Sequence, residues 1–491
     1  MNEDTRIYIP HKISWSLVGL VAGPLIALGI YYALGSAEGL SEPGRRLAGV
    51  ASLMALWWVF ESIPLAATAL LPIVLFPVLG ILPVGDTTAR YAHKLIFLFM
   101  GGLFLGVGLQ RWNAHKRLAL LIIILVGTSP KRLVGGIMLA AAVLSAFVSN
   151  TATAMMMLPI VLAVGSLAVS DDPDHPHARS YTTCLLLSLA YGASIGGIAT
   201  ITGTPPNGFL AAFMVQDMGI EMTYVRWLAF GIPLSAVLLP LAWAYLVFIA
   251  APVRIHAMEG GRALMHERLE ALGPIRRPEL MSLVVFGWTA AAWIAHPFLE
   301  ARGLIPKIDD ASIAIAGAIL LFIIPSGQPD RSRLLSWKHA ESIPWGVLLL
   351  FGGGLALAAG VTDSGLDTWI GAQISSVGNP GELPLIGGVT SLIVFLTEIT
   401  SNTATTSTML PVLAAVGEGL GIDPTLLIIG AAVSASCAFM LPVATPPNAI
   451  VFSSGHITIR RMALAGLGLN LIAIVVITLM VWGLARPLLN L

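Results

Sequence analysis

The chain contains one polar phrase twice within apolar sequence, as Ser149-Asn150-Thr151-Ala152-Thr153 and as Ser401-Asn402-Thr403-Ala404-Thr405. A Met-Leu-Pro sequence follows each copy, and the asparagine precedes that proline by nine residues both times. Polar side chains at membrane depth cost free energy unless they serve a purpose there. The two matched copies therefore predict one site that is assembled from two halves of the chain.

The composition is that of a protein embedded in a lipid bilayer. Of the 491 residues, 56% are hydrophobic and 11% are charged, whereas a soluble domain usually carries about 25% charged residues. The formal net charge of zero gives no indication of a nucleic-acid partner. Both cysteines, Cys184 and Cys437, lie in apolar runs, which argues against a disulfide framework or a structural zinc site.

Membrane spans are predicted from uncharged runs, because a helix needs roughly 20 apolar residues to cross the hydrocarbon core. The runs that are compatible with one span each are 13–35, 47–60, 62–85, 95–110, 227–253, 281–299, 311–329, 342–362 and 463–485.

Longer stretches contain a polar or proline-rich interruption and do not fit one helix each; they are 133–170, 180–216, 383–417 and 424–459. The first and third break at the two Ser-Asn-Thr phrases. The second breaks at Gly203-Thr204-Pro205-Pro206-Asn207, and the fourth breaks at Ala444-Thr445-Pro446-Pro447-Asn448. A Pro-Pro step cannot continue a helix. Irregular backbone at membrane depth is tolerated only where protein or a watery cavity covers it.

An internal repeat explains the matched phrases. Ser149 and Ser401 differ by 252 positions, and Gly101-Gly102-Leu103 and Gly353-Gly354-Leu355 keep the same offset. We therefore expect four parts: an N-terminal segment with the first span (1–44), a first repeat (45–253), a cytoplasmic connector with a linking span (254–308) and a second repeat (309–491).

The two repeats are expected to have opposite orientations in the membrane. If 133–170 and 383–417 are re-entrant hairpins, five spans lie between them, and an odd number puts the second hairpin on the opposite face. With a cytoplasmic N-terminus, 18 of the 26 Lys and Arg residues lie on the inner side, in accord with the positive-inside rule. The expected fold is an all-α polytopic membrane protein with 11 transmembrane helices and two opposed re-entrant hairpins.

The hairpin tips offer groups for both a cation and an anion. The half-helix that follows a tip presents unpaired N–H groups and a positive dipole end, which suit a carboxylate. The half-helix that precedes it presents free carbonyl oxygens, which suit a hard cation such as Na⁺. No Lys, Arg or His lies in either hairpin or either Pro-Pro break. A buried dianion would need compensation, which favours coupling to cations, although an exchanger of anions fits as well.

The same sequence allows other interpretations. A single Ser-Asn-Thr in a membrane helix is usually a packing contact or an interhelical hydrogen bond, but two copies with matched Pro-Pro breaks favour a site. Gly192-Ala193-Ser194-Ile195-Gly196 matches the nucleophile elbow of hydrolases, yet that elbow needs a preceding strand. Glu398 could titrate near the site, although a structural partner between helices is the preferred interpretation.

The paired Ser-Asn-Thr phrases and paired Pro-Pro breaks resemble those of the divalent anion:sodium symporter family, and the resemblance covers nearly the whole chain. The family carries dicarboxylates, citrate or sulfate. The resemblance implies a homodimer in which a scaffold domain holds a mobile transport domain that works as an elevator.

The resemblance also implies the binding residues. The first cation site would use Ser145, Ser149, Asn150 and Gly203, and the second would use Thr397, Ser401, Asn402 and Ala444. Carboxylate contacts would come from Ser149, Asn150, Thr151, Thr204 and Pro205, and from Ser401, Asn402, Thr403, Thr445 and Pro446. The second break departs from the first, since Ala444 replaces Gly203 and Pro442 replaces Ile201; both keep a backbone carbonyl.

The expected function is Na⁺-coupled import of a C4 dicarboxylate such as succinate, fumarate or malate across the inner (plasma) membrane, without a cofactor and without enzymatic activity. The alternatives are a Na⁺-independent dicarboxylate exchanger of the same fold and a sulfate or citrate transporter.

Overall fold

The computed structural model describes residues 15–167, 176–255, 260–375, 378 and 380–489. The expected N-terminal segment 1–44 is thus described only from Trp15 onward. Within these residues the protein is helical, and the extended structure is a single isolated bridge between Pro325 and Arg333. The all-α fold predicted from the sequence is confirmed.

The helices of the first half are α1 (Trp15–Ala33), α2 (Glu42–Val59), α3 (Leu65–Thr68), α4 (Leu71–Val78), α5 (Val84–Ala89), α6 (Lys94–Arg111), α7 (Ala114–Val126), α8 (Pro130–Ser145), α9 (Asn150–Leu167), α10 (Pro176–Ile198), α11 (Pro205–Gln216) and α12 (Tyr224–Tyr245).

The helices of the remainder are α13 (Gly261–Ala271), α14 (Arg277–Ala301), α15 (Asp310–Ile323), α16 (Trp337–Ala340), α17 (Trp345–Asp363), α18 (Leu366–Ser375), α19 (Glu382–Leu396), α20 (Asn402–Gly419), α21 (Pro424–Ala435), α22 (Pro446–Ser453), α23 (Ile459–Met480) and α24 (Arg486–Leu489).

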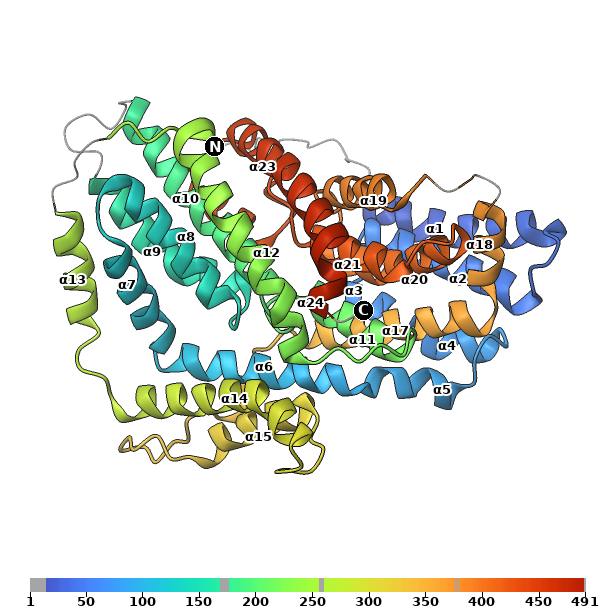
Figure 1. Cartoon of the computed structure of the whole chain (residues 1–491), viewed down its shortest axis with the longest axis horizontal. Helices are drawn as coiled ribbons and strands as arrows, with labels where there is room; N and C mark the ends of the chain where they lie inside the picture. Colours follow the sequence, from blue (N-terminus) through green and yellow to red (C-terminus); the bar gives the residue numbers. More distant parts are fainter. Residues whose placement is uncertain (1–14, 168–175, 256–259, 376–377, 379, 490–491) are drawn as a thin grey trace, which may run out of the picture.

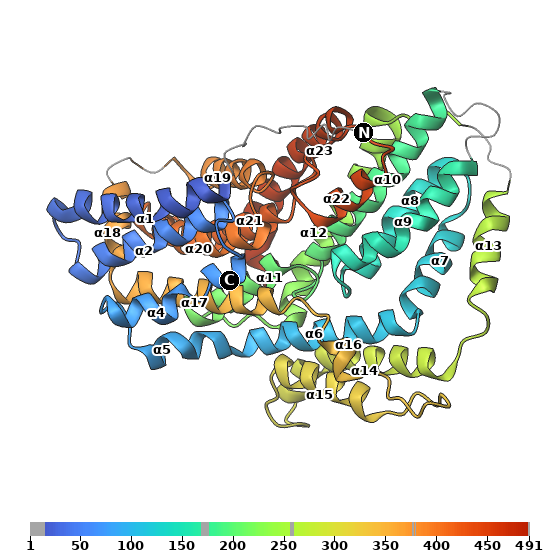
Figure 2. The same ribbon diagram turned by 180° about the vertical axis from the view of Figure 1, so that it is seen from behind.

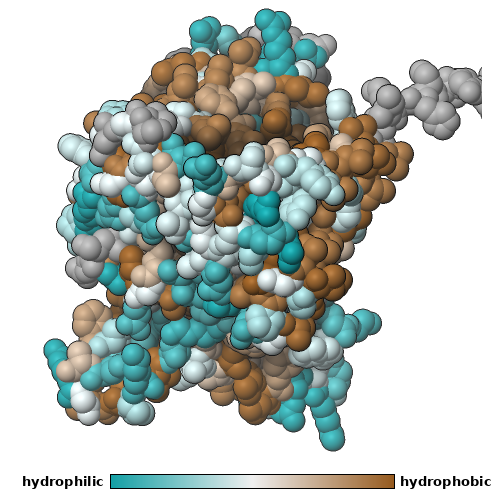
Figure 3. All heavy atoms as spheres, turned by 90° about the vertical axis from the view of Figure 1, so that its right-hand side faces the viewer, coloured by the Kyte–Doolittle hydropathy of each residue, from teal (hydrophilic) through white to brown (hydrophobic). Residues whose placement is uncertain are grey.

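The described helices include eight that are long and apolar enough to cross a membrane, by length and composition. Shorter apolar helices lie at Leu65–Val78, Asp310–Ile323, Glu382–Leu396 and Pro424–Ala435. Large apolar side chains are exposed along α1, among them Trp15, Leu25 and Tyr32. Figure 3 shows broad apolar areas on the end of the molecule where α1 and α2 lie. An apolar exterior of this extent is expected where lipid replaces water as the solvent.

The helices form an elongated body (Figures 1 and 2). Helices α5 and α6 run along one long edge, and α14 and α15 pack on the outer side of α6. Helices α7, α8 and α9 lie at one end, and α1, α2 and α18 lie at the other. A large hydrophobic core joins the helices from α6 to α12 with those from α19 to α23. A smaller core at the other end contains Leu47, Trp58, Phe76 and Leu357.

The four long stretches break at the positions that the sequence predicts. The phrase at Ser149 separates α8 from α9, and the phrase at Ser401 separates α19 from α20. The Pro-Pro steps begin α11 and α22, where the missing N–H groups of proline cost no helical hydrogen bond. The chain is therefore divided into half-helices at each of the four motifs.

The helices that follow the Pro-Pro half-helices are built alike in the two halves. The hydroxyl of Thr223 caps α12 by accepting the N–H of Arg226 at 3.2 Å, and that of Thr458 caps α23 by accepting the N–H of Arg461 at 3.3 Å. Each helix also ends in a π-helical turn, at Leu246–Ala250 and at Val481–Ala485. The likeness thus extends beyond the motifs that the sequence analysis used.

The structure departs from the sequence analysis at two segments. The run 62–85 is not one continuous helix, because Pro64, Pro72 and Pro83 stand at helix starts and divide it into α3, α4 and the beginning of α5. The helix α7 was not predicted, because Lys116 and Arg117 interrupt its apolar pattern. It packs against α8 and so supports the first broken stretch.

Candidate functional site

The first tip brings side-chain and backbone oxygens together across the helix break. The hydroxyl of Ser145, the last residue of α8, donates to Oδ1 of Asn150, the first residue of α9. A Cβ atom placed on Gly197 would lie 2.9 Å from Asn150 Oδ1 and 3.2 Å from the carbonyl oxygen of Gly203. The amide oxygen of Asn150 and the carbonyl oxygen of Gly203 therefore both lie close to the position that a side chain on Gly197 would fill.

The second tip repeats this arrangement. The hydroxyl of Thr397 donates to Asn402 Oδ1 at 2.6 Å, again across five residues and a helix break. The same hydroxyl lies 2.9 Å from the carbonyl oxygen of Ala435 at the end of α21. Ser145 and Thr397 are both fully buried. A hydroxyl and an amide oxygen thus meet at each tip, with the carbonyl of Gly203 in the first break near one pair and the carbonyl of Ala435 at the end of α21 near the other.

Not every residue implied by the family resemblance joins these clusters. The hydroxyl of Ser149 accepts the N–H of Ala152 at 3.3 Å and so caps the start of α9. No hydrogen bond within the described part of the chain links Ser401 to the Thr397–Asn402 pair. Ala444 lies in the turn before α22, where its N–H donates to the carbonyl of Leu441 at 3.2 Å.

Four half-helices begin at the four motifs, so their unpaired N–H groups and positive dipole ends arise from the repeated sequences. Thr151 and Thr403 lie in the first turns of α9 and α20, and Thr204 and Thr445 precede α11 and α22. Both N-cap threonines are buried. Pro205 is half-buried and Pro446 is exposed.

The packing of these half-helices is crossed between the repeats. Helix α9 of the first repeat packs against α22 of the second, and α11 of the first packs against α20 of the second. Figure 2 shows α22 beside α9 and α10. The half-helices that begin at the motifs of one half therefore pack against those of the other half.

Two asparagines that the sequence analysis did not assign hold the Pro-Pro breaks together. The amide of Asn207 is shared among the carbonyls of Gly197, Ile198 and Thr200, at 3.1, 3.0 and 2.8 Å. Asn448 donates to the carbonyls of Ala438 and Leu441 at 3.1 and 3.0 Å. These carbonyls lie at the end of α10 or in the non-helical segments that follow α10 and α21, where no helical N–H is available to them. The position of Asn directly after Pro-Pro in both breaks was the signal available in the sequence.

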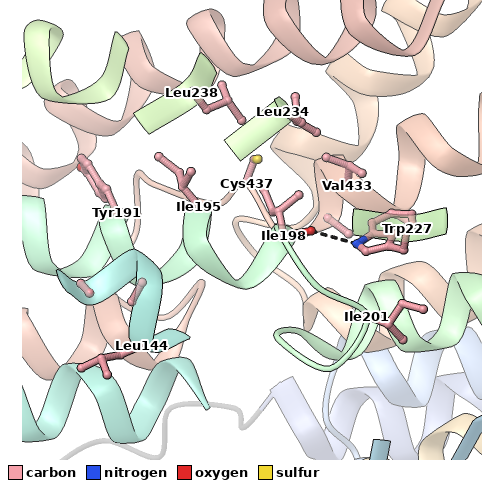
Figure 4. Packing of buried hydrophobic residues seen from close by; sticks show 14 of the residues in the cluster. Leu144, Tyr191, Ile195, Ile198, Ile201, Trp227, Leu234, Leu238, Val433 and Cys437 are labelled. Atoms are coloured by element: carbon pink, nitrogen blue, oxygen red, sulfur yellow. Dashed lines mark hydrogen bonds between the residues drawn. The ribbon is translucent and has the colours of Figure 1, made fainter. Parts of the chain in front are cut away.

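Packing around the first break is equally specific. Figure 4 shows Ile195 and Ile198 of α10 near Val433 and Cys437 of the second repeat, and the indole of Trp227 donating to the carbonyl of Ile198. That bond measures 3.0 Å. The hydroxyl of Tyr191 reaches across the repeats to the carbonyl of Phe439 at 2.9 Å.

We expect Asn448→Ala to destabilise the protein by roughly 1–3 kcal/mol, because it removes the side-chain donor to the carbonyl of Ala438 and one of the two donors to the carbonyl of Leu441. The measurement is thermal unfolding of the purified protein in detergent. Ser453→Ala on the same helix is the matched control, since its exposed hydroxyl bonds only the carbonyl of Ile450. Equal unfolding temperatures for the two variants would contradict the assigned role.

The interpretation of Ser194 as a hydrolase nucleophile has no support in the geometry. Its hydroxyl is buried and has no hydrogen-bond partner among the described residues. The flanking Gly192 and Gly196 instead allow α10 to pack on α8, because a Cβ on either would meet the backbone of Met138 or Ala142.

Cavities of about 680, 320 and 360 Å³ are lined by other residues and by none of the four motifs. The largest lies between Arg111, Arg117 and Arg276. The paired oxygen clusters define the candidate site, because a closed tip presents ligands without leaving an open volume.

Broken apolar helices and paired oxygen clusters at the breaks define a multi-pass membrane transporter as the class of this protein. The family profile described as the transmembrane region of sodium:sulfate symporters matches residues 12–490. The chain belongs to this family, the divalent anion:sodium symporters, and the resemblance stated from the sequence is confirmed.

Curated relatives of high similarity are members of the same family. The chain is 40% identical over 479 residues to the sodium-dependent dicarboxylate transporter SdcS of Staphylococcus saprophyticus, covering 96% of this chain and 92% of the relative. It is also 40% identical over 471 residues to the protein of that name from Staphylococcus aureus, covering 95% and 90%.

Solved structures show the same fold at low sequence identity. The YdaH transporter of Alcanivorax borkumensis matches with a TM-score of 0.62 at 16% identity, covering 97% of this chain and 99% of that one. MtrF of Neisseria gonorrhoeae matches with a TM-score of 0.57 at 12% identity, covering 98% and 97%.

Proposed function

We propose that this protein is a Na⁺-coupled symporter that imports C4 dicarboxylates such as succinate, fumarate and malate across the inner (plasma) membrane. The observation that carries the proposal is the equivalence of the Ser145–Asn150 and Thr397–Asn402 pairs. Relatives of 40% identity that are named sodium-dependent dicarboxylate transporters support the choice of ion and substrate class.

The oxygen clusters fit Na⁺ as the coupling ion. Hydroxyl, amide and carbonyl oxygens are the ligands that hard cations take. The proposed first set is Ser145, Asn150 and Gly203 with Ser149. The proposed second set is Thr397, Asn402, Ser401 and Ala444, and the carbonyl of Ala435 also lies beside Thr397. In both sets the hydroxyl donates its hydrogen bond to the amide oxygen. Rotation of that hydroxyl group would free both oxygens to bind a cation.

The helix starts fit the two carboxylates of the substrate. Backbone N–H groups at a helix N-terminus bind anions, and the motifs add Thr151, Thr204, Thr403 and Thr445 beside Asn150 and Asn402. Pro205 and Pro446 begin the other two half-helices. Because no basic side chain lies in the hairpins, bound Na⁺ ions would supply the remaining compensation of charge.

The proposal includes the architecture. Repeats at 45–253 and 309–491 would be inverted about the membrane plane, with a cytoplasmic N-terminus, 11 spans and opposed re-entrant hairpins at 133–170 and 383–417. Residues 254–308 would form the cytoplasmic connector and linking span. The matched caps and π-helical ends of α12 and α23 support the repeat. Transport would proceed by an elevator movement within a homodimer.

The test is uptake of labelled succinate into proteoliposomes that contain no dicarboxylate. An inward Na⁺ gradient is expected to drive accumulation, whereas replacement of Na⁺ by K⁺ is expected to abolish it. Uptake only into vesicles preloaded with dicarboxylate, and without Na⁺, would establish an exchanger instead.

The family description favours sulfate as a second candidate substrate, because the matching profile is named for sodium:sulfate symporters. Excess sulfate is expected to leave succinate uptake nearly unchanged. Strong competition by sulfate would assign the site to inorganic divalent anions.

A further inference from the structure

The second hairpin contains a carboxylate that the first hairpin lacks. Glu398 stands three residues before Ser401, where the first hairpin has Ala146 three residues before Ser149. Its side chain is only 3% exposed, and it is the only formally charged residue in 383–417. A buried charge at this depth is costly unless it is held by strong partners.

Hydrogen bonds from the neighbouring break hold this carboxylate. Oε1 accepts the backbone N–H groups of Phe439 and Met440 at 2.8 and 2.9 Å, and Oε2 accepts that of Leu441 at 3.0 Å. The amide of Asn470 on α23 donates to Oε1 at 2.8 Å. No Lys, Arg or His of the described chain forms an ion pair with Glu398, so its negative charge is solvated by neutral donors alone.

The first repeat ties its tip to its break in a weaker way. There the hydroxyl of Thr200 donates to the backbone carbonyl of Ala146. This is one bond between neutral groups, whereas Glu398 accepts four bonds as a charged group. Hydrogen bonds to charged groups are stronger than those between neutral groups. The two tips are therefore alike in their oxygen clusters and unlike in how firmly those clusters are held.

Glu398 acts on both sides of the second oxygen cluster. It follows Thr397 directly, whose hydroxyl bonds Asn402 and Ala435. It also fixes residues 439–441, and the carbonyl of Leu441 in turn bonds the N–H of Ala444. The carboxylate thus orders the segment that leads to the proposed ligand Ala444, and its uncompensated charge favours a cation nearby.

We propose that Glu398 is a positioning residue that makes the second cation site the tighter of the two, so that Na⁺ fills the Thr397–Asn402 site before the Ser145–Asn150 site. The inference rests on the proposed Na⁺ coupling and adds an order to it. Glu398 does not contact the ion. It orders residues 439–441 through its hydrogen bonds, and its negative charge attracts the cation.

Equilibrium binding of radioactive Na⁺ to the purified full-length protein tests the proposal. The wild type is expected to show a tighter and a weaker phase. Glu398→Gln is expected to weaken the tighter phase at least tenfold and to leave the weaker phase within about twofold, because its amide N–H₂ group replaces an acceptor that a backbone N–H requires. Succinate uptake at saturating Na⁺ is expected to keep its KM.

Matched variants keep the test decisive. Thr478→Val on α23 removes a buried hydroxyl that has no hydrogen-bond partner within the described ranges of the chain, and it is expected to bind Na⁺ like the wild type. Asn470→Ala retains the charge and removes one of its donors, so it is expected to weaken the tighter phase by roughly threefold even if Glu398→Gln does not fold.

An unchanged tighter phase in Glu398→Gln, or equal weakening of both phases, would overturn the proposal while leaving Na⁺ coupling intact. A wild type that binds no Na⁺ and shows no Na⁺-dependent uptake would overturn the proposed function as well.

Discussion

Asn150→Ala and Asn402→Ala are each expected to reduce Na⁺-driven succinate uptake at least tenfold. Each asparagine accepts a hydrogen bond from a buried hydroxyl across the helix break and begins a half-helix. Losing a contact to a charged ligand costs roughly 1.5–3 kcal/mol, and 1.4 kcal/mol corresponds to about tenfold in affinity. The measurement is initial uptake into proteoliposomes over a range of Na⁺ and succinate concentrations.

Ser194→Ala is the control for these variants, because its buried hydroxyl has no hydrogen-bond partner in the part of the chain that the structure describes and lies outside both clusters. It is expected to transport like the wild type. Loss of activity in Ser194→Ala together with normal uptake by both asparagine variants would favour a membrane-embedded hydrolase over a transporter.

Gly203→Ala is expected to impair transport and to lower the unfolding temperature. A Cβ atom at Gly203 would meet the carbonyl group of Gly197 and lie 3.0 Å from its Cα and carbonyl carbon. Backbone atoms cannot move aside as a flexible side chain can, and overpacking costs about 1–3 kcal/mol. The carbonyl of Gly203 would move away from Asn150. We therefore expect the Na⁺ concentration for half-maximal uptake to rise several-fold.

Gly388→Ala is the matched control, since Gly388 lies exposed within α19 and a Cβ there would meet nothing within 4 Å. It is expected to be neutral or to stabilise the helix by up to about 1 kcal/mol. Normal Na⁺ dependence in Gly203→Ala would remove Gly203 from the first cation site. The natural alanine at 444 shows that the close approach is confined to the first break.

The breaks of the fold were predictable because they depend on local chemistry. Proline cannot donate within a helix, so the Pro-Pro steps mark half-helices wherever they stand. Ser145 and Thr397 were expected only through the family resemblance, and each stands five residues before its motif asparagine. The run 62–85 was expected to be one helix because it carries no charge, but its prolines begin new helices and interrupt it.

The contacts between distant segments were not predictable from one sequence. Nothing local indicates that α9 packs against α22 and α11 against α20, because these contacts depend on how the two halves interlock. The role of Asn207 and Asn448 likewise needs the position of the carbonyls that they bind. For Glu398 the sequence left two interpretations open, and the four donors identify a structural partner between helices.

A cryo-EM map of the protein with Na⁺ and succinate tests the central claim most directly. The account predicts cation density at the oxygen clusters of Asn150 and Asn402, and carboxylate density at the starts of the half-helices that these residues begin. Succinate density in the cavity between Arg111, Arg117 and Arg276 instead, with nothing at either tip, would contradict the account.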